Sequence, residues 1–89
     1  MIICWDVDGC LIDKNKKPIR ANIALLKVLS KSHKVFVWSG NGWEYALVEI
    51  TRLKLNKYIN GILNKYNTFV PDLAFDDQEI ILGKLNIKV

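Results

Sequence analysis

The sequence predicts an α/β protein in which a parallel β-sheet forms the centre of a three-layer sandwich. Short, continuously apolar segments alternate along the chain with segments of helical periodicity, and this alternation is typical of parallel strands joined by right-handed helical crossovers. Each apolar segment spans only a few residues, as in a strand that is buried on both faces. The length of 89 residues corresponds to one domain, so we expect a single domain over residues 1–89.

The predicted strands follow one another at regular intervals. Residues 2–7 form an apolar run that ends in Asp8-Gly9 and predicts the first strand. Residues 10–18 are typical of a loop or a small hairpin. Further strands are expected at residues 35–38, 61–64 and 73–75, with a weaker candidate at 86–89.

Two helices are expected between the first three strands. Residues 19–32 carry an apolar stripe formed by Ile23, Leu26 and Leu29. Residues 43–56 repeat apolar side chains at helical spacing, so we expect these side chains to pack in the core. They are Trp43, Ala46, Leu47, Ile50 and Leu53.

The composition indicates a cytoplasmic protein with no membrane partner. No apolar run approaches the roughly 20 residues that cross a bilayer, and no charged leader precedes the first apolar run. Cys4 and Cys10 are too few for a disulfide framework and match no zinc ligand spacing, so we interpret them as reduced thiols. The net charge of +4 fits an anionic ligand such as a phosphate ester or nucleic acid, or else a solvated lysine surface.

Polar side chains follow four of the predicted strands, at the point where each strand ends. The carboxyl ends of parallel strands meet at the same edge of a sheet, where ligands bind in open α/β folds. We therefore expect these polar groups to form one site. They are Asp6 and Asp8, Ser39, Lys65, and Asp76 and Asp77.

These residue types suit phosphoryl transfer. Asp6 and Asp8 are two residues apart at a strand end and tend to face the same way. Their mutual repulsion favours a hard cation with oxygen ligands such as Mg²⁺, and a carboxylate can also attack phosphorus. Ser39 and the N–H of Gly40 can hold a phosphate where a helix begins, and Lys65 can offset charge on the transferred group.

The same residues resemble the motifs of the haloacid dehalogenase superfamily. The segment Asp6-Val7-Asp8-Gly9-Cys10-Leu11 is similar to motif I, and residues 35–41 are similar to motif II, a strand that ends in Ser or Thr. Lys65 fits motif III, and residues 73–77 resemble the form of motif IV that has two aspartates. The motifs occur in the family's order and cover essentially the whole chain.

The resemblance implies a catalytic and metal-binding role for the acidic residues. Asp6 would be the nucleophile and a Mg²⁺ ligand. Asp8 would be the general acid for the leaving group and then the base for the attacking water, with its carbonyl on the metal. Asp77 would be the direct ligand from motif IV, with Asp76 in support. The family's dehalogenases lack the second carboxylate of motif I and need no metal, so Asp8 indicates phosphotransfer.

The resemblance also implies a phosphate-binding set, which consists of Ser39, Gly40, Asn41 and Lys65. The chain departs from the family at Cys10, where Thr is commonest. The segment between Lys65 and Asp76 is short for the family's usual helix, and this leaves Lys57 as the alternative to Lys65.

The function that we expect is Mg²⁺-dependent hydrolysis of phosphomonoesters through an aspartyl-phosphate. No insertion in the sequence is large enough for a cap domain, so the site should be open. An open site suits a large substrate, such as a nucleic-acid end or a phosphoprotein, whereas a homo-oligomer could cover it and restrict access to small phosphorylated metabolites. The basic charge favours nucleotides or nucleic-acid ends. The alternative function is a non-catalytic binding or regulatory module on the same scaffold.

Overall fold

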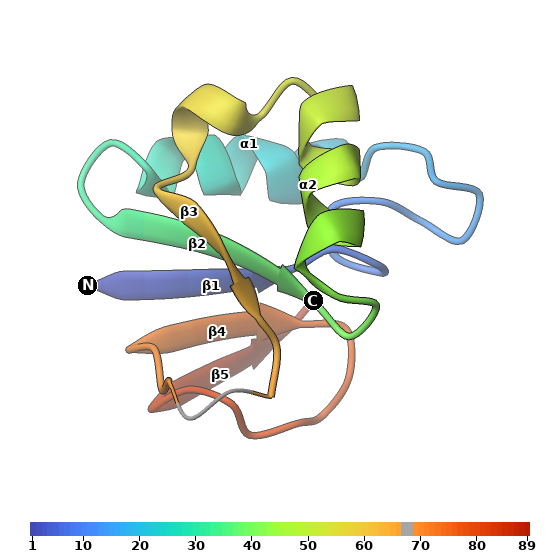
Figure 1. Cartoon of the computed structure of the whole chain (residues 1–89). Coiled ribbons are helices and arrows are strands. Elements are labelled where there is room, and N and C mark those ends of the chain that lie inside the picture. Colours follow the sequence, from blue (N-terminus) through green and yellow to red (C-terminus); the bar gives the residue numbers. More distant parts are fainter. Residues whose placement is uncertain (67–68) are drawn as a thin grey trace.

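A computed structural model describes residues 1–66 and 69–89 and shows five parallel strands with two α-helices. The strands pair in the order β3-β2-β1-β4-β5, with every pair parallel (Figure 1). The predicted α/β architecture with a parallel sheet is therefore confirmed. The elements are β1 (Ile2–Asp6), α1 (Arg20–Leu29), β2 (Lys34–Ser39), α2 (Trp43–Arg52), the 3₁₀ helix η1 (Asn56–Tyr58), β3 (Gly61–Asn64), β4 (Leu73–Asp76) and β5 (Leu85–Lys88).

The register of the sheet brings the strand ends together. Asp6 at the end of β1 is the partner of Trp38 in β2, and Ser39 at the end of β2 is the partner of Asn64 at the end of β3. Trp5 is the partner of Phe75 in β4, which places Asp6 next to the end of β4. All the strands run the same way, so these residues share the carboxyl edge of the sheet.

Both helices cover the same face of the sheet (Figure 1). The crossovers from β1 to β2 and from β2 to β3 move in the same direction along the sheet, and right-handed crossovers then place their helices on one side. The main core forms on this face from Leu26 of α1, Ile50 of α2 and apolar residues of the strands. Trp5 and Phe75 stack there with ring centroids 3.9 Å apart, and each buried side chain of this size contributes about 1.5–3 kcal/mol.

The opposite face of the sheet has a smaller core. Cys4, Trp38 and Ala74 are buried there, and Leu82 from the loop between β4 and β5 packs against them. Residues 65–66, 69–72 and 77–84, which belong to the connections that follow β3 and β4, contain no helix. The expected third layer is therefore not confirmed for the described residues.

The helices differ from their predicted extents and orientation. The first spans Arg20–Leu29 rather than 19–32, and the second ends at Arg52 because the chain turns at Lys54, which has a left-handed φ of 59°. The buried residues of α2 are Ala46, Glu49 and Ile50. The prediction that Trp43 and Leu47 pack in the core is wrong, because this orientation of the helix leaves them 48% and 42% exposed.

The remaining sequence predictions concern the loops, cysteines and membrane. Residues 10–18 include a small hairpin in which Ile12 bridges Pro18. Cys4 and Cys10 are both buried and form no disulfide with each other. No helix in the described part of the chain has the length and apolarity to cross a bilayer.

Candidate active site

The carboxyl edge of the sheet holds a cavity of about 330 Å³ that collects residues from four separate segments. It contains most of the side chains that the sequence singled out, while Asp76 lies buried beside it. The residues that line it are Asp6, Asp8, Ser39, Gly40, Asn41, Lys65, Tyr66, Asp77 and Gln78.

Lys65 links two buried carboxylates. Its Nζ lies 3.1 Å from Oδ1 of Asp6 and 2.7 Å from Oδ2 of Asp76. The Lys65 side chain is only 6% exposed. Burial by itself lowers the pKa of Lys65, but the carboxylates of Asp76 and Asp6 outweigh it and raise the pKa above its ordinary value. Lys57, the alternative phosphate ligand, instead lies in η1 with its Nζ 5.2 Å from the centre of the Tyr58 ring.

Asp6 is buried in a cluster that contains more negatively charged side chains than positively charged ones. Burial, together with the charges of Asp76 and Asp77, raises the pKa of Asp6 to about 6 in spite of the opposing effect of Lys65. One lysine thus faces three acidic side chains. A bound cation would relieve this excess of negative charge.

The donor atoms at the site fit Mg²⁺. Carboxylate oxygens of Asp6 and Asp77 and the Sγ of Cys10 lie within 4.8 Å of one another. Burial, together with the nearby carboxylates, raises the pKa of Cys10 above its ordinary value, so the thiol is neutral and a poor ligand. The two carboxylates therefore remain as the oxygen donors that Mg²⁺ prefers.

Asp76 and Asp77, which follow Phe75, have different contacts. Asp76 accepts the N–H of Gln78 at 3.1 Å and pairs with Lys65, so both of its oxygens are occupied by the protein. Asp77 lies in the cluster with Asp6, and burial and Asp76 raise its pKa. Asp77 is thus the member of the pair that lies with Asp6, whereas Asp76 pairs with Lys65.

Gly9 is required by the position of Asp77. Its φ of +81° lies in the left-handed region, and a β-carbon built on it would overlap the Asp77 carboxylate. Only glycine combines this backbone conformation with so close an approach. Gly9 therefore makes room for the Asp77 carboxylate.

Asp8 is held by two donors from the segment that follows β2. Its Oδ2 accepts the side-chain amide of Asn41 at 3.0 Å, and its Oδ1 accepts the hydroxyl of Tyr45 at 2.7 Å. Burial and Asp8 raise the pKa of Tyr45 to about 12, so the phenol stays protonated and donates. The side chain of Asn41, which the resemblance assigns to phosphate binding, thus contacts Asp8.

Ser39 presents a hydroxyl to the cavity. The residue is 3% exposed, and its Oγ accepts the backbone N–H of Asn41 at 3.0 Å. None of the residues that the structure describes accepts its O–H, which can therefore donate to a ligand oxygen in the cavity. Gly40 follows on the exposed side, and α2 begins after Gly42, whose φ of +98° again favours glycine.

The sequence reasoning missed Tyr45, Tyr66 and Gln78. Tyr45 lies in α2, four residues after Asn41, which precedes the helix. Tyr66 and Gln78 each directly follow a predicted site residue, Lys65 and Asp77. Adjacency was therefore the available signal for Tyr66 and Gln78, whereas no local pattern singled out Tyr45.

Comparison with known proteins adds no relative. No protein family, curated protein or solved structure matches this chain. The resemblance to the haloacid dehalogenase superfamily accordingly depends on the motifs and on the way in which their residues converge.

Proposed function

We propose that the chain is a Mg²⁺-dependent phosphomonoester hydrolase of the haloacid dehalogenase type without a cap domain, acting through an aspartyl-phosphate. The observation that carries this proposal is the convergence of Asp6, Asp8 and Lys65 on one cavity, together with Ser39 and Asp77. A nucleophile, a proton donor, a phosphate-binding cation and a metal-binding carboxylate are the components that phosphoryl transfer requires.

The reaction has two steps. In the first, an Asp6 oxygen forms a bond to phosphorus while the bond to the leaving alcohol oxygen breaks, and Asp8 gives that oxygen its proton. In the second, water attacks phosphorus, Asp8 takes a proton from the water, and the bond from phosphorus to Asp6 breaks. Lys65 and Ser39 hold the phosphoryl oxygens in both steps.

A metal ion would be held by the Asp6 and Asp77 carboxylates and by the carbonyl of Asp8. Mg²⁺ would supply positive charge that offsets the negative charge of the phosphoryl group and of the carboxylates. Asp76 would keep the Lys65 side chain in place, since its Oδ2 pairs with the Lys65 ammonium at 2.7 Å.

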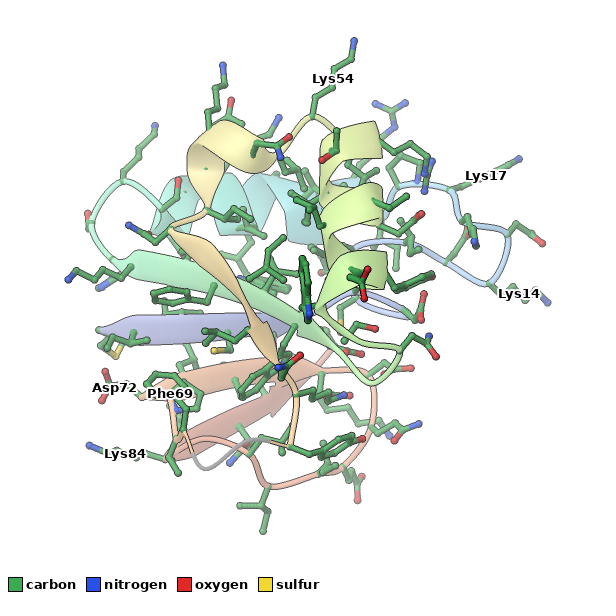
Figure 2. The ribbon with its side chains drawn as sticks, viewed as in Figure 1. Lys14, Lys17, Lys54, Phe69, Asp72 and Lys84 are labelled. Atoms are coloured by element: carbon green, nitrogen blue, oxygen red, sulfur yellow. The ribbon has the colours of Figure 1, made fainter. Side chains whose placement is uncertain are left out.

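Lysines beside the site can contact a substrate with more than one negative group. A second cavity of about 350 Å³ shares Asp8 and Asp77 with the first and is also lined by Asp13, Lys14 and Lys16. Lys14 and Lys17 project from this loop into solvent (Figure 2). These lysines can contact further phosphates, so nucleotides and nucleic-acid ends are the substrates that we propose. A homo-oligomer that covers the cavity would instead restrict access to small phosphorylated metabolites.

A phosphatase screen over nucleotides, sugar phosphates and phosphorylated oligonucleotides tests the proposal. We expect phosphate release that requires Mg²⁺ and disappears with EDTA. Asp6→Asn should abolish turnover while the protein stays folded, because an amide cannot act as the nucleophile. Glu44→Gln is the control and should stay active, because Glu44 is exposed and does not line the cavity. Near-native activity of Asp6→Asn would overturn the covalent mechanism, whereas no activity of the wild type with Mg²⁺ would favour the non-catalytic binding module.

A further inference from the structure

The Asp8 carboxylate has an inner and an outer oxygen with different surroundings. The hydrogen bond from Tyr45 to Oδ1 is partly buried and measures 2.7 Å, whereas the bond from Asn41 to Oδ2 is exposed and measures 3.0 Å. Oδ2 is thus the oxygen on the open side. A protonated carboxyl can still accept one hydrogen bond at Oδ2 while it donates its own proton from that atom.

Tyr45 is itself firmly placed. Its ring packs against the main core, and the Nζ of Lys16 lies 5.4 Å from the centre of the ring. The carbonyl of Lys16 in turn accepts a hydrogen bond of 2.8 Å from Arg52 of α2. The phenol therefore reaches Asp8 from a ring that contacts both the core and the Lys16 side chain.

We propose that Tyr45 is a positioning residue, which holds the inner oxygen of Asp8 so that the outer oxygen faces the leaving group. This inference depends on the proposed function and extends it to a residue outside the four motifs. Asp6 forms its bond to phosphorus, the bond to the leaving oxygen breaks, and the proton on Oδ2 of Asp8 moves to that oxygen. A carboxyl group that rotates freely would deliver this proton less often.

The inference predicts that the effect of Tyr45 depends on the leaving group. An alkoxide is a strong base and must be protonated as it leaves, so β-glycerophosphate needs Asp8 in the right orientation. Nitrophenolate leaves as a stable anion, so hydrolysis of p-nitrophenyl phosphate does not need a proton from Asp8. A change that merely disturbs the fold or the phosphate site would slow both reactions alike.

The test compares Tyr45→Phe with the wild type on these two substrates. We expect kcat for β-glycerophosphate to fall about 10-fold, with KM nearly unchanged, because positioning is part of a general-acid effect of about 10²–10⁴-fold. The rate with p-nitrophenyl phosphate should fall less than about 2-fold. Tyr58→Phe is the matched control, since Tyr58 also packs against the core below a lysine, and both rates should stay at the wild-type level.

The outcomes separate this inference from the proposed function. Equal losses on both substrates, or no loss on either, would overturn the role of Tyr45 while leaving the phosphatase intact. A wild-type protein that hydrolyses neither substrate with Mg²⁺ would overturn the proposed function and this inference together. Circular dichroism of Tyr45→Phe shows whether the variant is folded. If it is not, Tyr45→Leu, which keeps an apolar side chain but has no hydrogen-bond donor, replaces it in the same comparison.

Discussion

The ammonium of Lys65 lies 3.1 Å from the carboxylate of Asp6, although 59 positions separate the two residues in the chain. The pair is buried, and the same ammonium also reaches Asp76. Lys65 therefore offsets the charges of two carboxylates in the folded protein. In the proposed reaction it would also bind the phosphoryl oxygens.

Replacement of this lysine should affect both activity and stability. Lys65→Met removes the ammonium but keeps most of the volume, so we expect kcat/KM to fall about 10²-fold, as when other electrostatic stabilisers are lost. Breaking a buried ion pair costs about 3–5 kcal/mol of unfolding free energy, so the metal-free variant should melt at a lower temperature. Mg²⁺ should recover part of this loss, because it replaces the missing positive charge. Steady-state kinetics and thermal unfolding with and without Mg²⁺ measure these effects.

Lys57→Met provides the control. Lys57 lies over the Tyr58 ring and away from the cavity residues, so its loss should change the unfolding free energy by less than about 1 kcal/mol. Activity should remain at the wild-type level. A larger kinetic defect in Lys57→Met than in Lys65→Met would reverse the assignment of the phosphate-binding lysine.

The stabilisation by Mg²⁺ should depend on pH. The pKa of Asp6 is about 6 in the folded protein and 3.8 ordinarily. In the metal-free protein, the unfolded chain therefore ionises first, and the contribution of Asp6 to stability falls as the pH rises from about 4 to about 6. Protons compete with the cation over the same range, so the rise in Tm with Mg²⁺ should be small at about pH 5 and large at about pH 7.5. A rise in Tm that is equal at both pH values would contradict this prediction.

The two aspartates of the fourth motif should respond differently to the same change. Asp77→Asn removes a direct oxygen donor, so the rise in Tm with Mg²⁺ should largely vanish. Asp76→Asn should keep much of that rise, because Asp76 contacts Lys65 and the N–H of Gln78 rather than the cluster that includes Asp6 and Cys10. Titration calorimetry with Mg²⁺ gives the same comparison directly, and weaker binding in Asp76→Asn than in Asp77→Asn would exchange their roles.

Gly9 should tolerate no larger residue. Gly9→Ala forces a side chain into a left-handed conformation, at a cost of about 1–2 kcal/mol, and its β-carbon would displace the Asp77 carboxylate. We expect a lower Tm and a weaker response to Mg²⁺. Gly40→Ala is the control for stability, since its β-carbon would meet nothing closer than the Tyr66 ring at 3.8 Å, and it should shift the unfolding free energy by about 0.5 kcal/mol or less.

Local patterns were sufficient for the strands and for the edge at which the site forms. A strand buried on both faces leaves a continuous apolar run, and residues 2–6 and 73–75 show it directly in the sequence. Parallel direction follows from alternation with helices, and it alone brings the polar residues after these runs to one edge. The juxtaposition of Asp6 with Lys65 could thus be predicted without any coordinates.

Only the tertiary structure decided which face of α2 is buried and what its residues contact. The apolar spacing placed Trp43 in the core, but the helix rests on Ala46 and Ile50 and leaves Trp43 on its flank. The same rotation aims Tyr45 at Asp8, a contact between residues 37 positions apart. Helical periodicity defines a stripe, whereas the angle at which that stripe meets the sheet depends on packing against distant segments.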